Sequence, residues 1–201
     1  MTTPIELIIV FLSSFGFNLI PFAGPSNLFI ASNLALMLGN FDPIVLMTIG
    51  FLVASGAALA KSVHYLVTFF VGKRLSEKQR QRLDAEALKV KKWAALLLFT
   101  VAVTPIPDEP VIIPLGLMKY SPVKFFSAYF LGKLCITVVG AFLGAWTGTT
   151  LTEWLTPSET VVLSVILTIV ITVIMLKVDF GKLAQRLFKK KPKIPDSTAK
   201  Q

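Results

Sequence analysis

The chain has 201 residues, of which 54% are hydrophobic and only 15% are charged. Such an apolar composition excludes an ordinary soluble domain and indicates an integral membrane protein that crosses the bilayer several times. A net charge of +9 would suggest nucleic-acid binding in a soluble protein, but the positions of the basic residues argue against a nucleic-acid partner here.

Basic residues are concentrated in two segments. Eight of the 20 Lys and Arg lie in 73–92 and eight in 177–201, whereas the segments around Glu6, Asp42 and 149–159 contain acids and no basic residue. Positive charge stays on the cytoplasmic side of a membrane protein. We therefore expect a multi-pass protein of the cell membrane, with 73–92 and the C-terminal tail in the cytoplasm, where basic residues also contact anionic lipid.

Helix starts are marked by a capping side chain followed by proline at the first helical position. This signal predicts helices beginning near 4, 43, 122 and 157, at Thr3-Pro4, Asp42-Pro43, Ser121-Pro122 and Thr156-Pro157.

The first part of the chain, 4–72, contains two apolar arms, 4–20 and 25–39, around a proline-containing turn, and then a spanning helix, 43–72. The arms are short for a crossing, which needs roughly 20 residues. They predict a re-entrant hairpin, although the sequence leaves open whether they span fully.

An amphipathic helix, 76–92, follows and is expected to lie along the cytoplasmic interface. A second hairpin, 93–118, and a second spanning helix, 122–148, come next. A last span, 157–176, leads to the basic tail, 177–201.

The order of hairpin and long helix occurs twice, in 4–72 and 93–148, and the two copies enter from opposite sides. The predicted fold is therefore an all-α membrane domain, 1–176, built from two inverted repeats. Inverted repeats with broken helices are typical of transporters, which bind their substrate at mid-membrane.

Four charges lie far from the ends of the apolar segments or at the hairpin tip, where burial in the membrane is expected. Lys61 and Lys133 lie within the long helices, and Asp108 and Glu109 lie at the tip of the second hairpin. Each costs roughly 2.5–3.5 kcal/mol at the bilayer centre, so we expect the four to compensate one another. Two other interpretations stay open: a purely structural ion-pair cluster that locks the hairpin, and lysines that extend to the interface.

The hairpins also predict an anion site. If Pro25 and Pro110 open half-helices, free amides and positive dipole ends meet at the midplane, where they would bind phosphate together with the two lysines. Ser26, Asn27 and Thr104 are expected to add hydrogen bonds.

The carboxylates Asp108 and Glu109 are then predicted proton carriers or counter-ions of the lysines. His64, one turn beyond Lys61, is a candidate proton relay, with packing or an interfacial hydrogen bond as the alternative. Tyr129 is interpreted as an ordinary core or lipid-facing aromatic residue.

No enzyme signature is present in the sequence. It has no metal-ligand set, no glycine-rich phosphate loop and no nucleophile at a recognisable spacing from a base. We therefore expect neither catalysis nor a cofactor.

One proline-rich motif runs from Thr104-Pro105-Ile106-Pro107-Asp108-Glu109-Pro110 to Gly116 and continues with Phe125, Phe126 and Gly132; a weaker one is Pro21 through Pro25. On these residues the chain resembles the DedA family, whose domain is also called the VTT or SNARE-associated Golgi protein domain. The resemblance covers roughly residues 15–150, and the first motif is its strongest part. The resemblance implies two opposed re-entrant hairpins and movement of polyprenyl-phosphate carriers or phospholipids between leaflets.

The leading hypothesis is thus a flippase or scramblase for a phosphate-bearing lipid. The alternatives are a proton-coupled exporter of small cations or drugs that uses Asp108 and Glu109, and a membrane interaction protein that recruits partners through 76–92 and the tail. The sequence leaves open the lipid, the energy source and whether the protein forms a homo-oligomer.

Overall fold

The computed structural model describes residues 2–21, 25–74, 92–104 and 108–151, together with the single residues 162, 166 and 170. The predicted interfacial helix, the last span and the tail fall outside this part of the chain, apart from residue 92 and the three single positions. The described residues contain no strand, which confirms the all-α class. Their helices are, in chain order, α1 (Pro4–Leu19), α2 (Asn27–Leu38), α3 (Pro43–Lys73), α5 (Ala94–Val103), α6 (Glu109–Leu117) and α7 (Pro122–Leu151).

Three of the four proline-marked helix starts are confirmed, and the fourth, at 157, lies outside the described residues. In α1 the Glu6 amide donates to Thr3 Oγ1 at 3.3 Å and the Thr3 amide donates to Glu6 Oε2 at 2.7 Å, which completes a capping box. At the start of α3 the Ile44 amide donates to Asp42 Oδ1 at 2.8 Å. These caps satisfy amides that would otherwise have no partner in the first turn.

Two of the helices are long. With 31 and 30 residues and a rise of about 1.5 Å per residue, α3 and α7 each extend about 45 Å and are apolar enough to cross a membrane. The other four have 16, 12, 10 and 9 residues. None of these reaches the roughly 30 Å thickness of a hydrocarbon core.

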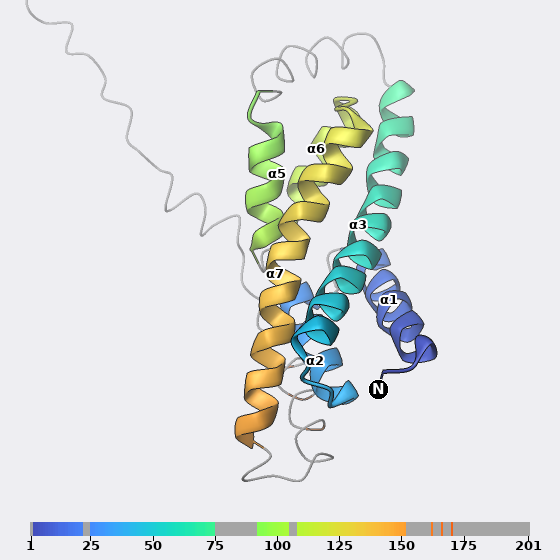
Figure 1. Cartoon of the computed structure of the whole chain (residues 1–201). Coiled ribbons are helices and arrows are strands. Elements are labelled where there is room, and N and C mark those ends of the chain that lie inside the picture. The colour runs from blue at the N-terminus through green and yellow to red at the C-terminus, as the bar shows by residue number, and fades with distance from the viewer. Residues whose placement is uncertain are drawn as a thin grey trace, which may run out of the picture.

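The long helices pack against each other, and a pair of short helices lies at each end of them (Figure 1). At one end α1 packs on α3 and α2 packs on α7; at the other end α5 packs on α7 and α6 packs on α3. The members of a short pair have few contacts with each other. Each short pair is therefore held mainly by the two long helices, one partner to each.

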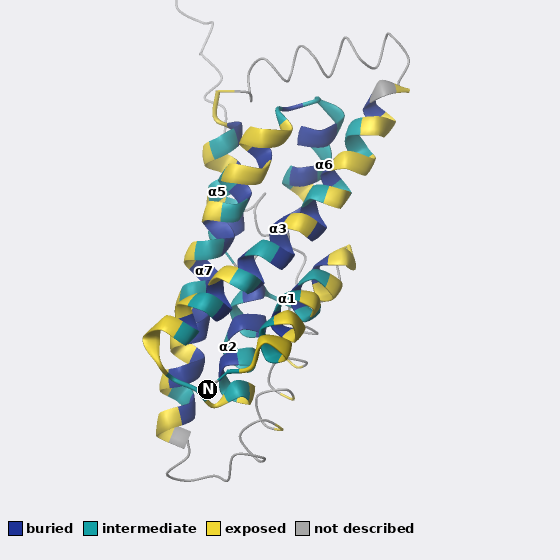
Figure 2. Ribbon diagram, turned by 45° about the vertical axis from the view of Figure 1, so that its right-hand side comes forward, coloured by how far each residue is buried: buried dark blue, intermediate teal, exposed yellow. Residues whose placement is uncertain are grey.

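Each end of the molecule has its own apolar core. The core at the α1–α2 end includes Val10, Ile30, Ile49 and Ala141, and the core at the α5–α6 end includes Leu98, Ile112, Tyr65, Phe125 and Tyr129. Burial follows the inner faces of the helices in Figure 2.

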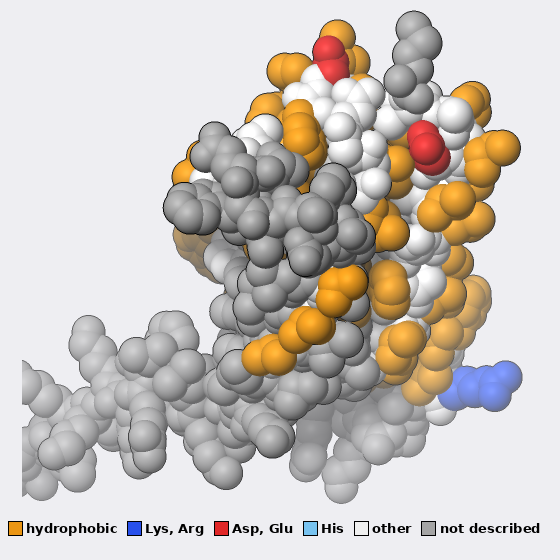
Figure 3. All heavy atoms as spheres, turned by 90° about the horizontal axis from the view of Figure 1, so that it is seen from below, with side chains coloured by type: hydrophobic (Ala, Val, Ile, Leu, Met, Phe, Trp, Pro, Cys, Tyr) orange, Lys and Arg blue, Asp and Glu red, His pale blue; other side chains and the backbone are white. Residues whose placement is uncertain are grey.

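Large apolar side chains cover much of the outside of the molecule. Examples are Ile44, Val123 and Trp146, which are 75%, 74% and 69% exposed. Seen from the end where α1 and α3 begin, hydrophobic side chains lie over much of the described surface, with acidic ones among them (Figure 3). An apolar patch of this extent is unusual on a soluble monomer and suits contact with lipid.

Glycines on α7 allow α2 to approach closely. A Cβ added at Gly140 would lie 2.5 Å from the Leu28 carbonyl oxygen, and one added at Gly144 would lie 2.3 Å from that of Ser32. These atoms belong to the backbone, so a side chain there would push the helices apart. Gly140 and Gly144 are four residues apart and so lie on one face of α7, a spacing of small residues that lets membrane helices approach closely.

Candidate functional site

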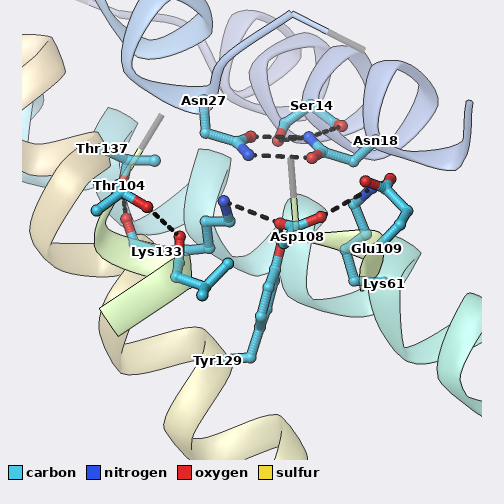
Figure 4. Close-up of polar contacts among 11 residues, drawn as sticks. Ser14, Asn18, Asn27, Lys61, Thr104, Asp108, Glu109, Tyr129, Lys133 and Thr137 are labelled. Carbon is cyan, nitrogen blue, oxygen red and sulfur yellow. Dashed lines mark hydrogen bonds and ion pairs between the residues drawn. The ribbon is translucent and has the colours of Figure 1, made fainter. Parts of the chain in front are cut away.

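The four charged residues within the apolar segments come together at one place (Figure 4). Lys61 Nζ lies 3.3 Å from Asp108 Oδ1 and also donates to Glu109 Oε1, while Lys133 Nζ lies 3.1 Å from Asp108 Oδ2. All four are 4–5% exposed. The expected mutual compensation of two lysines and two carboxylates is confirmed.

The cluster lies deep within the long helices. Lys61 is 12 residues before the end of α3 and Lys133 is 11 residues after the start of α7. At about 1.5 Å per residue, both positions are about 17 Å from the same end of the molecule. Both lysine side chains are buried in ion pairs with Asp108 and do not extend to the helix ends; the interfacial interpretation stays untested, since it depends on where the bilayer lies along the helices.

Tyr129 is a fifth member of the cluster that sequence reasoning missed. Its hydroxyl donates to Asp108 Oδ2, and its ring lies 5.1 Å below Lys133 Nζ. The side chain is fully buried and stacks on Phe125 at 5.9 Å. The signal available in the sequence was spacing, because Tyr129 and Lys133 are four residues apart and so share one face of a helix. We call Lys61, Asp108, Glu109, Tyr129 and Lys133 the charged layer.

The start of α6 explains where the two carboxylates point. Asp108 is the residue before the helix and Glu109 is its first residue, while Pro110 occupies the first turn. The Asp108 side chain makes no capping hydrogen bond to its own helix and bonds the lysines and Tyr129 instead. The carboxylates are also favoured by the positive end of the α6 dipole. The N-terminus predicted to bind phosphate therefore already has two negative charges beside it.

A second, uncharged polar group links α1 to α2. Asn27 Nδ2 donates to Asn18 Oδ1 at 3.0 Å, and Asn18 Nδ2 donates to Asn27 Oδ1 at 2.8 Å. Ser14 Oγ donates to the Val53 carbonyl of α3 at 2.7 Å. All three polar residues are buried. We call Ser14, Asn18 and Asn27 the amide layer; Ser14 and Asn18 were not predicted, although a lone Asn in an apolar arm was a visible signal.

The amide layer lies alongside the segment of α3 that bears Lys61. Ser14 bonds Val53, and the Leu19 carbonyl contacts His64 Nε2 at 3.0 Å, so contacts from α1 flank Lys61 along α3. Figure 4 shows the amide layer on one side of the charged layer.

The remaining predicted site residues have other surroundings. α2 begins at Asn27 with Ser26 before it, so the expectation that Pro25 opens this helix is wrong by two residues. The Ser26 hydroxyl is buried with no hydrogen-bond partner, and Thr104 Oγ1 donates to the Val101 carbonyl at 2.9 Å.

His64 bonds α1 through Nε2, and its Nδ1 is buried with no hydrogen-bond partner. This is the packing alternative for His64, and its role as a relay stays a prediction. Within the described ranges, no group of His, Cys, Asp and Glu is arranged to hold a metal ion.

Two long apolar helices, an apolar outer surface and a charge cluster enclosed between helices are consistent with an integral membrane protein. The family model of the VTT domain matches residues 4–146, which is most of the chain. The protein therefore belongs to the DedA family. No curated protein and no solved structure matches the chain.

Proposed function

We propose that the protein moves a phosphate-bearing lipid, such as a polyprenyl phosphate or a phospholipid, between the leaflets of the cell membrane without chemical change. The observation that carries the proposal is the pair of buried lysines, one on each long helix, held on the two oxygens of a single carboxylate. A phosphate also presents several oxygens on one centre, so it can accept from both ammonium groups.

The helix arrangement supports a transporter built from inverted repeats. Exchanging α1, α2 and α3 with α5, α6 and α7 preserves the main contacts between short and long helices: α1 on α3 becomes α5 on α7, and α2 on α7 becomes α6 on α3. The smaller contact of α2 with α3 has no counterpart of similar extent between α6 and α7. The short helices at opposite ends of the long pair would then be two opposed re-entrant hairpins. Rocking of one repeat against the other would expose the lysines to each leaflet in turn.

In this proposal the headgroup bonds Lys61 and Lys133 first. Asp108 and Glu109 balance the lysines when no lipid is bound, which avoids an uncompensated buried charge. Asn27 and Thr104 already have intramolecular partners, so they are secondary contacts in the proposal. The Ser26 hydroxyl has no hydrogen-bond partner and is proposed as an additional donor to the headgroup.

The test is leaflet exchange of a fluorescent polyprenyl phosphate in liposomes that contain the purified protein. We expect faster exchange than in empty liposomes and a loss of about tenfold or more in Lys61→Ala, since a hydrogen-bonded charge contributes about 1.5–3 kcal/mol. The matched control is Lys124→Ala, an exposed lysine of α7. Exchange equal to that of empty liposomes contradicts the proposal, as does full exchange in a folded Lys61→Ala variant.

A second measurement, of proton release, separates this function from a proton-coupled exporter of small cations. An exporter would need Asp108 and Glu109 as its cation site and would not need the lysines. Proton release on addition of a cationic drug, lost in Asp108→Asn and kept in Lys61→Ala, would favour the exporter.

We also propose that the end with the starts of α5 and α7 faces the cytoplasm. Arg74, Lys119 and Lys124 lie at or near this end, whereas Glu6 and Asp42 lie at the other. In a Cys135→Ser background, a membrane-impermeant thiol reagent applied to whole cells should label Asp42→Cys and not Lys124→Cys. The reverse labelling would invert the orientation.

A further inference from the structure

The Asp108 carboxylate is held by three donors that all come from the long helices. Lys61 of α3 approaches Oδ1 at 3.3 Å, Lys133 of α7 approaches Oδ2 at 3.1 Å, and the Tyr129 hydroxyl of α7 donates to Oδ2. Both carboxylate oxygens are therefore used, and one anionic group joins α3 to α7. Glu109 bonds Lys61 on the α3 side.

This arrangement is unusual for the residue that precedes a helix. An Asp at that position ordinarily accepts from the first free amides of its own helix, and the Asp108 side chain makes no such bond. It acts instead as a ligand of groups on two other helices. The three donors lie on the long helices α3 and α7, whereas the Asp108 carboxylate belongs to the residue directly before the nine-residue helix α6.

We infer that Lys61, Lys133 and Tyr129 form an oxyanion site which Asp108 occupies from within the chain, so that an external phosphate and Asp108 compete for the same three donors. This rests on the proposed function in one respect, since a lipid headgroup would enter by displacing Asp108. A carboxylate or phosphate of either source matches the donors, because each presents two oxygens on one atom.

Removal of the internal competitor should expose the site to anions in solution. In Asp108→Asn the side chain keeps its shape, but the cluster gains one uncompensated positive charge, which an anion from solution can balance in competition with proton release by a lysine. A tethered group competes at an effective concentration in the millimolar range or above. Wild-type protein should therefore need at least about tenfold more anion than this variant.

The experiment measures the thermal unfolding of the full chain in a neutral detergent while sodium formate or sodium phosphate replaces sodium chloride at constant ionic strength. We expect a saturable rise in Tm of about 5 °C for Asp108→Asn. Asp108→Ala should respond in the same way, and if it does not fold, Asp108→Asn carries the test. Adding Tyr129→Phe to Asp108→Asn should weaken the response several-fold.

The matched control is Glu109→Gln, which also leaves one unbalanced buried lysine but keeps Asp108 in place. Equal anion sensitivity in Asp108→Asn and Glu109→Gln would overturn the inference, because the response would then follow net charge and not the three donors. An Asp108→Asn variant whose Tm is insensitive to both anions would overturn it as well.

A further arm identifies the source of the ligand. Decyl phosphate, which partitions into the detergent micelle, is compared with inorganic phosphate on Asp108→Asn. Stabilisation at much lower concentrations of decyl phosphate assigns the site to a lipid headgroup, and equal potency assigns it to free phosphate; either result supports the oxyanion site. If anions stabilise Asp108→Asn but the wild-type protein does not exchange lipid between leaflets, the proposed function is wrong and the oxyanion site stands. If the wild-type protein exchanges lipid but anions do not stabilise Asp108→Asn, only the inferred competition by Asp108 is wrong.

Discussion

The charged layer and the amide layer satisfy buried polar groups at neighbouring places in different ways. The amide layer is a closed ring in which Asn18 and Asn27 each donate to the other. The charged layer instead gathers donors from both long helices on one carboxylate. A reciprocal amide pair is complete without a ligand, whereas lysines held by a carboxylate can exchange it for another anion. The difference suggests a structural link in one layer and a binding site in the other.

Removing one lysine should break the charged layer most severely. Lys133→Ala removes one of the two lysines that bond Asp108 and leaves the buried cluster with two carboxylates and only Lys61 to balance them. An uncompensated buried charge of this kind typically costs about 3–5 kcal/mol of stability. Thermal unfolding in detergent should show a large fall in Tm for Lys133→Ala and almost none for the exposed Lys124→Ala. A Lys133→Ala protein as stable as the Lys124→Ala control would mean that the cluster is not a compensated unit.

The next largest effect is expected at the close contact between α2, which carries Asn27 of the amide layer, and α7. A side chain that pushes α2 away from α7 should destabilise the protein. In Gly144→Ala the new Cβ would lie 2.3 Å from the Ser32 carbonyl oxygen, so we expect a loss at the upper end of the roughly 1–3 kcal/mol range for overpacking. Gly16→Ala is the matched control, since nothing lies within 4 Å of its added Cβ. Comparable unfolding temperatures for the two variants would argue against the close helix contact.

The smallest effects are expected from the two amides themselves. Asn18→Ala and Asn27→Ala each remove both hydrogen bonds between the two amides, at about 1–2 kcal/mol, although Asn18 still donates to the Ser14 carbonyl in Asn27→Ala. Both variants should lower Tm by similar amounts and change leaflet exchange by less than about twofold, as additive structural effects would. A selective loss of exchange in Asn27→Ala, at equal stability, would make Asn27 a direct headgroup contact and the amide layer part of the site.

Much of this architecture follows from local signals in the sequence. The starts of α1 and α3 are fixed by a capping side chain and proline, and α7 begins at Pro122, as its proline signal predicts; these signals act within one turn. The meeting of Lys61, Lys133, Asp108 and Glu109 follows from the free energy of burying charge in an apolar medium, which leaves few arrangements available. Both inferences rest on physics that does not depend on the details of packing.

The features that were missed depend on tertiary contacts. In the sequence, Tyr129 cannot be told from any other buried aromatic residue of an apolar helix. Its role depends on the approach of α6, which brings Asp108 to its hydroxyl. Asn18 and Asn27 are nine residues apart on two helices, so their pairing requires the turn between those helices to bring them together. The start of α2 at Asn27 instead of Pro25 shows that proline marks a boundary only to within a few residues.

The most direct test of the account is whether a phosphate headgroup lies on the buried lysines. Solid-state NMR of protein with ¹⁵N-labelled lysine, in bilayers that contain a polyprenyl phosphate as the sole phosphorylated lipid, measures the dipolar coupling between lysine Nζ and phosphorus. The account predicts coupling at hydrogen-bonding distance in wild-type protein that is lost in Lys61→Ala/Lys133→Ala and kept in Lys119→Ala/Lys124→Ala. Leaflet exchange by wild-type protein with no coupling that depends on Lys61 and Lys133 would contradict it.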